Sequence, residues 1–219
     1  TYPGDDGREY TLHLIDTPGH VDFSYEVSRS LAACEGAILL VDAAQGVQAQ
    51  TVANLYLALE ADLEIIPVIN KIDLPNADPG RCRNQIINLT GFKEDEIIEI
   101  SAKEGVGIRE LLEEVIRRVP PPGGDTSRPL QGLVFDSVYN NYRGVIVYTR
   151  IFQGILQTGE KILLMNSGLE YEVKEIGIFA PEMEEVEALK AGEAGYIIAN
   201  IKEPSEVKIG DTLTDAARR

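Results

Sequence analysis

Residues 64–73 read Glu-Ile-Ile-Pro-Val-Ile-Asn-Lys-Ile-Asp, and the fold of the first half of the chain can be worked out from this stretch. The apolar run from Ile65 to Ile69 is short and continuous, which is typical of a strand buried on both faces of a parallel sheet. Pro67 is unusual there, because proline has no N–H to donate to a neighbouring strand. The polar residues that begin at Asn70 follow directly, and ligands bind at this end of the strands in α/β sheets.

The same order, an apolar strand followed by polar residues, recurs on both sides of this stretch. Further strands are predicted at residues 10–15, 37–41 and 97–100, and they end at Asp16, Asp42 and Ser101. The continuous apolar run at 37–41 also predicts a strand buried on both faces. Apolar residues at helical spacing predict helices at residues 23–34, 52–59 and 108–119. Asp78, as a cap, followed by Pro79 in the first turn predicts a further helix from residue 78 onward. Strands that alternate with helices indicate a parallel sheet covered by helices.

The prolines from Pro120 to Pro122 mark a domain boundary, since they cannot continue a helix and they stiffen the chain. Beyond them, short strands separated by glycines are predicted at residues 133–138, 145–152, 161–165, 171–179 and 194–201. Short strands with regular turns are typical of a small barrel or sandwich. We therefore predict domains over residues 1–122 and 129–219, joined by a linker of residues 123–128.

Composition restricts the class of protein. The 219 residues are 44% hydrophobic, enough for a real core, and no apolar run approaches the roughly 20 residues of a membrane span. A formal net charge of −16 argues against nonspecific binding to nucleic acid, although local basic patches can still contact RNA. Cys34 and Cys82 are isolated, so we expect reduced thiols in a cytosolic protein rather than a disulfide framework or a thiolate metal site.

The stretch Asp16-Thr17-Pro18-Gly19-His20 follows the first predicted strand. An aspartate at a strand end can hold a magnesium ion through water. Glycine lets the backbone approach a terminal phosphate and donate its N–H, and a polar residue just beyond can orient an attacking water. The alternative is a turn capped by an aspartate, with His20 as a cap of the following helix.

The stretch Asn70-Lys71-Ile72-Asp73 predicts recognition of guanine. The Asp73 carboxylate can accept hydrogen bonds from both N1–H and the exocyclic amine of guanine, a donor pair that adenine lacks. Asn70 can brace the loop, and Lys71 can lay its alkyl stem along the base. Backbone N–H groups of Ser101, Ala102 and Lys103, after the last strand, could contact the guanine O6. The second and third of these motifs are weak alone, but the order of all three motifs at three strand ends makes chance agreement rare.

The three motifs resemble those of P-loop GTPases, and Asp-Thr-Pro-Gly-His resembles the translation factors among them. Other stretches look like the LepA (elongation factor 4) family more than EF-G or BipA, and the likeness covers essentially the whole chain. These are residues 21–36, Pro120-Pro121-Pro122, Tyr139-Asn140-Asn141-Tyr142-Arg143-Gly144 and Ile176-Gly177-Ile178-Phe179-Ala180-Pro181. The resemblance implies an α/β P-loop NTPase sheet, truncated at its N-terminus, that is followed by the β-barrel domain two of translation factors.

The resemblance also implies roles for residues of the first motif. Asp16 would lie near Mg²⁺ through water, Gly19 would meet the γ-phosphate, and His20 would position the hydrolytic water. Residues 17–33 would form the second switch. The implied cofactors are GTP or GDP and Mg²⁺, and the implied partners are the ribosome, through rRNA and ribosomal proteins, and tRNA-loaded elongation complexes, with no DNA. Such factors are cytoplasmic, some are said to associate with the inner membrane face, and both back-translocation and ribosome assembly are open as activities.

The sequence departs from the family in what it lacks. No G-x-x-x-x-G-K-[ST] occurs, and Gly154 and Gly159 have that spacing but are followed by Glu160 and Lys161. The first switch and the later domains of the family are also absent. In the family a central strand lies between the strands that end here at Asp16 and Asp42. Because an unpaired buried edge is costly, we expect the first half to be unstable or rearranged and the barrel to fold normally.

Two alternatives to a ribosome-dependent GTPase are open. This chain could be a non-catalytic module that docks on the ribosome, or it could belong to another translation factor such as an EF-G-like or ribosomal protection protein. Tyr139 and Tyr142 could stack on RNA or pack at the barrel edge. Four arginines are expected on solvated faces: Arg81, Arg83, Arg117 and Arg118.

Overall fold

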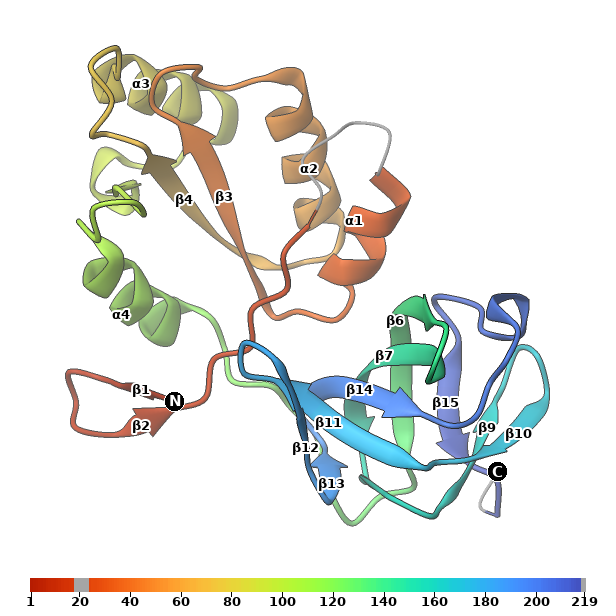
Figure 1. Ribbon diagram of the computed structural model, residues 1–219. Helices are drawn as coiled ribbons and strands as arrows, with labels where there is room; N and C mark the ends of the chain where they lie inside the picture. The colour runs from red at the N-terminus through yellow and green to blue at the C-terminus, as the bar shows by residue number, and fades with distance from the viewer. Residues whose placement is uncertain (18–23, 218–219) are drawn as a thin grey trace. The chain divides into compact units, whose positions relative to one another are not determined.

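The computed structural model describes residues 1–17 and 24–217, and the chain divides into two units, Thr1–Pro121 and Pro122–Arg219 (Figure 1). The first unit contains a parallel sheet in the order β3-β4-β5. Its strands are β3 (Gly36–Asp42), β4 (Glu64–Asn70) and β5 (Ile98–Glu99). Its helices are α1 (Ser24–Leu31), α2 (Ala49–Glu60), α3 (Pro79–Thr90), α4 (Ile108–Arg118) and the short 3₁₀ helix η2 (Glu94–Glu96). The predicted parallel α/β sheet is therefore confirmed.

Strand β4 is buried on both faces, as predicted. Ile65 and Ile69 lie in clusters with residues of α1, α2 and α3. Ile66 and Val68 lie in a cluster with Leu111 of α4. Successive side chains of a strand point to opposite faces, so the continuous apolar run fills the two cores that the helices cover.

The register explains how Pro67 fits in this central strand. Ile100 N–H donates to the Ile69 carbonyl at 2.8 Å, so the backbone groups of Ile69 face β5. By the period of two, the Pro67 nitrogen faces the same side. Pairing of β4 with β5 begins only at Val68 and Ile98, so no ladder donor is required at Pro67.

The predicted strand at residues 10–15 is wrong. Only β2 (Glu9–Tyr10) forms, and it pairs with β1 (Tyr2–Pro3) in a hairpin, whereas residues 11–17 lie in no strand. Leu14 is 85% exposed. The expectation that β3 is buried on both faces is also wrong, because Leu40 is 53% exposed and Ile38 is exposed as well. Alternating apolar residues make a strand only where a neighbour completes the ladder, and β3 is an edge strand among the described residues.

We expect limited proteolysis to cut the chain first within residues 11–17. Their backbone has no ladder partner in the structure, and few buried contacts oppose local opening. Fragments are to be mapped by mass spectrometry over a time course at low protease concentration. Cleavage of the barrel unit before or together with this segment would contradict the expectation that the barrel is the more stable half.

The second unit is a curved antiparallel sheet in the order β10-β9-β15-β6-β7-β14-β11-β12, with a β13-β8 ribbon beside it. The longest strands are β6 (Gln131–Asn140) and β7 (Gly144–Gln153). The others are β8 (Ile155–Gln157), β9 (Lys161–Leu164), β10 (Leu169–Glu172), β11 (Glu175–Phe179), β12 (Met183–Glu185), β13 (Ala188–Lys190), β14 (Ala194–Ile198) and β15 (Thr212–Asp215). A 3₁₀ turn, η3, spans Pro204–Glu206.

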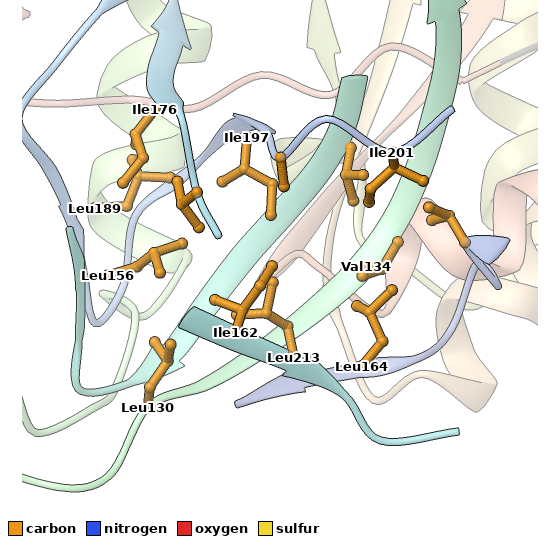
Figure 2. Close-up of a cluster of buried hydrophobic side chains, with 14 of the residues drawn as sticks. Leu130, Val134, Leu156, Ile162, Leu164, Ile176, Leu189, Ile197, Ile201 and Leu213 are labelled. Carbon is orange, nitrogen blue, oxygen red and sulfur yellow. The ribbon is translucent and has the colours of Figure 1, made fainter. Parts of the chain in front are cut away.

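One hydrophobic core holds this unit together. Figure 2 shows side chains from most of its strands converging, among them Val134, Ile162, Ile176, Ile197 and Leu213, all fully buried. Ile162 of β9 and Ile176 of β11 belong to opposite halves of the sheet order, yet they share this cluster. The sheet must therefore curl around its own inner face, as in a barrel.

Two strand predictions in this unit need correction. The predicted strand at residues 171–179 is two strands, because the chain turns at Val173 and Lys174 between β10 and β11. The strand predicted to reach residue 201 ends at Ile198. The sequence did not predict four strands of three or four residues each: β8, β12, β13 and β15. Such short segments carry too little periodicity to be recognised.

Several side chains expected on solvated faces have specific partners. The Arg118 side chain is 13% exposed, and its guanidinium donates to the Ile65 carbonyl at 2.9 Å and pairs with Glu64. Arg83 pairs with both Glu94 and Glu99. The expectation that Tyr142 packs at the barrel edge is also wrong, because this side chain is 99% exposed.

Candidate functional site

The polar residues after β4 and β5 meet at one edge of the sheet. Asn70 ends β4, and its side-chain oxygen accepts from the Lys71 N–H at 2.7 Å and from the Ala102 N–H at 3.1 Å. The second bond joins the loop after β4 to the loop after β5. Parallel pairing of Val68 with Ile98 brings the two strand ends level, so residues 32 positions apart come into contact. Asn70 therefore joins the end of β4 to the loop after β5.

Asp73 is held by Ser101. The Ser101 hydroxyl, 1% exposed, donates to Asp73 Oδ1 at 2.6 Å and accepts from the Glu104 N–H at 3.2 Å. This hydrogen bond is the main cause that lowers the pKa of the Asp73 carboxyl below its ordinary value. The carboxylate is thus ionised, oriented and exposed, which suits an acceptor for a pair of N–H donors on a ligand.

We expect nucleotide binding to depend on this pKa. The predicted recognition of guanine would use the ionised form of Asp73, so binding should be lost as pH falls through the lowered pKa. Ser101→Ala removes the main cause of the shift, so the pKa should rise toward its ordinary value and the loss should occur at a higher pH. Carbon-detected NMR of the Asp73 carboxyl, with binding measured in parallel, would check both. An unchanged midpoint in the variant would contradict the role of Ser101.

Lys71 lies between these contacts in a left-handed backbone conformation, with φ of 65°. Its ammonium nitrogen lies 2.8 Å from Asp42 Oδ2 at the end of β3, and 54% of its side chain is exposed. Lys103 is more exposed, and its ammonium lies 3.4 Å from Glu104 Oε1. The structure thus brings five of the predicted residues together: Asn70, Lys71, Asp73, Ser101 and Ala102.

The first motif is not assembled with these residues in the described structure. Asp16 is exposed and Thr17 half-buried, and both lie outside any strand. Pro18, Gly19 and His20 lie outside the described residues. Without the predicted strand before it, Asp16 has no sheet position that would carry it to the edge where Asn70 lies. Asp42, which contacts Lys71, was predicted only as a strand end, and no sequence signal singled it out.

These residues supply only part of the coordination that a magnesium ion needs. Among residues 1–17 and 24–217, no group of three or more His, Cys, Asp or Glu side chains is placed to hold a metal ion. Mg²⁺ in nucleotide sites usually keeps several waters and binds one or two carboxylates together with phosphate oxygens. A single exposed carboxylate such as Asp16 fits one water-mediated contact and no more.

No helix in the described part of the chain is long and apolar enough to cross a membrane.

Comparison with known proteins identifies both units. Residues 4–121 match the model of the elongation factor Tu GTP binding domain, and residues 144–214 match elongation factor Tu domain 2. The chain is 60% identical over 215 residues to elongation factor 4 of Thermotoga maritima, covering 98% of this chain and 35% of the relative. It is 57% identical over 215 residues to elongation factor 4 of Aquifex aeolicus, covering 98% of this chain and 36% of the relative.

The chain therefore spans about a third of the length of the curated relatives it matches. Within that span, the two matched models follow each other in the order of the two units of the structure. The parallel sheet with polar residues after β4 and β5 lies in the first match, and strands β7 to β14 of the single-core antiparallel unit lie in the second, whereas β6 precedes it. The chain belongs to the translational GTPase family that is built on the elongation factor Tu GTP-binding domain.

Proposed function

We propose that this chain carries the guanine-recognition part of a GTP-hydrolysing translation factor similar to elongation factor 4. The observation that carries the proposal is the hydrogen-bonded set Asn70, Asp73, Ser101 and Ala102. It presents an ionised carboxylate beside fixed backbone groups at the carboxyl end of a parallel sheet, where ligands of α/β proteins bind. We propose domain limits of residues 1–122 for the partial GTP-binding domain, 123–128 for the linker and 129–219 for the β-barrel domain.

Base recognition follows from the donors and acceptors in place. Asp73 would accept from N1–H and the exocyclic amine of guanine, and adenine offers no such pair. The Ser101 and Ala102 N–H groups are already directed to the Val106 carbonyl and to Asn70. We therefore expect the guanine O6 to meet the Lys103 N–H, with the Ala102 N–H shared between Asn70 and the base. The Lys71 stem would cover one face of the ring.

Hydrolysis is assigned to the residues of the first motif. His20 would orient the attacking water, and the Gly19 N–H would meet the γ-phosphate. Thr17 and Pro18 would shape the turn between them and Asp16, whose carboxylate would contact Mg²⁺ through water. A bound Mg²⁺ would supply positive charge that offsets the negative charge of the phosphates in the transition state, while these residues would position the reactants.

The proposed partner is the ribosome, contacted through its rRNA and ribosomal proteins. The ribosomes in question would be elongation complexes that carry tRNA. The β-barrel unit would dock there and would present the exposed Tyr142 at the tip of the β6–β7 hairpin. Back-translocation of tRNA and a role in ribosome assembly are both compatible with such docking, and we propose an action on elongating ribosomes.

A titration of the chain with GDP tests the proposed base recognition. Amide signals of residues 70–73 and 101–103 are followed by NMR, with ADP as the control for phosphate binding alone. We expect GDP to shift these signals at concentrations at which ADP does not. Equal effects of the two nucleotides, or none, would overturn guanine recognition by this chain.

A binding module is the second candidate function. It is favoured by the barrel unit, which has a hydrophobic core of its own. In that case the barrel unit would bind ribosomes in a sedimentation assay, and no nucleotide would alter the fraction bound. Dependence of ribosome binding on GTP would exclude this candidate.

A further inference from the structure

Asp42 ends β3 directly beside Asn70, its register partner at the end of β4. Its side chain is 18% exposed, and both carboxylate oxygens are engaged. Oδ1 accepts from the N–H groups of Ala44 at 2.8 Å and Gln45 at 3.2 Å. Oδ2 accepts from the Gln45 side chain at 3.3 Å and lies 2.8 Å from the Lys71 ammonium nitrogen. The carboxylate is thus fixed by its own loop before it meets the lysine.

Lys71 needs such support because of its backbone. A φ of 65° is a left-handed conformation that costs a non-glycine residue free energy, and it persists where surrounding contacts hold it. The Asn70 side chain holds the Lys71 N–H on one side, and Asp42 holds the ammonium on the other. The lysine stem is therefore tied at both ends.

Lys71 and Asp73 are held by residues at the ends of different strands. Lys71 is held by Asp42 at the end of β3, whereas Asp73 is held by Ser101 after β5. The two side chains proposed to contact the base are therefore each fixed by a neighbouring strand end, on either side of β4. The bond to Lys71 is also the main cause that lowers the pKa of the Asp42 carboxyl, which favours its ionised form.

We propose that Asp42 is a positioning residue for guanine recognition, which holds the Lys71 ammonium so that the lysine stem forms a fixed apolar wall for the base. This inference rests on the proposed function. Asp42 itself would not touch the nucleotide, since its oxygens are occupied by the loop and by Lys71. A stem that is ordered beforehand loses less conformational freedom on binding, and the gain appears as affinity.

The test is a double-mutant cycle of Asp42→Asn and Lys71→Met in the full chain, with GDP as the probe. Asp42→Asn keeps an oxygen for the Ala44 and Gln45 N–H groups but removes the charge. Because the ion pair is partly exposed, we expect the dissociation constant for GDP to rise about threefold to fivefold. Lys71→Met keeps an apolar stem without the ammonium, so adding Asp42→Asn to it should change the dissociation constant no further.

The control variant is Asp95→Asn, which makes the same change on an exposed carboxylate of η2 and should leave the GDP affinity unchanged. Additive effects of Asp42→Asn and Lys71→Met, or wild-type affinity in Asp42→Asn, would overturn the inference alone. Absence of GDP binding by the wild-type chain would overturn the proposed function instead. If Asp42→Asn does not fold, as judged by its thermal melt, Lys71→Met breaks the same pair from its exposed side. Wild-type affinity in Lys71→Met would then overturn the inference.

Discussion

Exchange of Asp73 for asparagine is expected to reverse the base preference of the site from guanine to xanthine. The Asp73 carboxylate would accept two N–H bonds from guanine, whereas an asparagine amide offers one acceptor and one donor group. Ser101 would still donate to the amide oxygen, as it now donates to Oδ1, and would turn the NH₂ group toward the base. Xanthine carries a carbonyl where guanine carries the exocyclic amine, so it would accept from that NH₂ group.

The expected effect is large because a buried donor left unpaired is costly in a site built to pair it. Sites of this kind discriminate by roughly 10⁴-fold in well-built cases. We therefore expect Asp73→Asn to change the ratio of the affinities for GDP and for xanthosine diphosphate (XDP) by about 10²-fold or more, relative to the wild-type chain. Competition between GDP and XDP, each against a fluorescent nucleotide, measures the ratio directly. Asp95→Asn serves as the matched control. If Asp73→Asn still preferred GDP, Asp73 would not read the base.

Replacement of His20 by alanine in the intact factor is expected to lower ribosome-stimulated GTP turnover by orders of magnitude, about 10³-fold or more. A water-positioning residue acts only on the transition state, so the affinity for GTP should change little. This prediction depends on the sequence motif from Asp16 to His20, because His20 lies outside the described residues.

Single-turnover hydrolysis on purified ribosomes, with GTP affinity measured separately, distinguishes the two effects. His13→Ala is the matched control, since His13 is the other histidine of the chain, is exposed and lies outside the motif from Asp16 to His20. Turnover of the His20→Ala variant at the wild-type rate would remove His20 from the catalytic assignment. An equal loss in His13→Ala would point to damage of the segment rather than to chemistry.

The order of elements and the guanine-reading motif could be read from the sequence. The apolar run at Ile65–Ile69 predicted a strand buried on both faces, and the helix start at Asp78 was predicted by its cap, whose carboxylate accepts from the Arg81 N–H at 3.0 Å. These signals are local, since an apolar run, a helix cap or a proline each involves only a few neighbouring residues. The likeness to a translational GTPase also depends only on the order and spacing of motifs.

Contacts between distant strands could not be read in this way. Alternation at residues 10–15 resembles a strand, but only Tyr10 lies in one, β2, and residues 11–15 stay outside the sheet, while Ile38 and Leu40 of the edge strand β3 are exposed. The bond from Ala102 to Asn70 and the pairing of Lys71 with Asp42 arise because parallel strands align their ends. The sequence by itself determined which residues could bind guanine, while tertiary structure decided which of them meet, because a hydrogen bond between residues about 30 positions apart exists only once the sheet has brought their strands side by side.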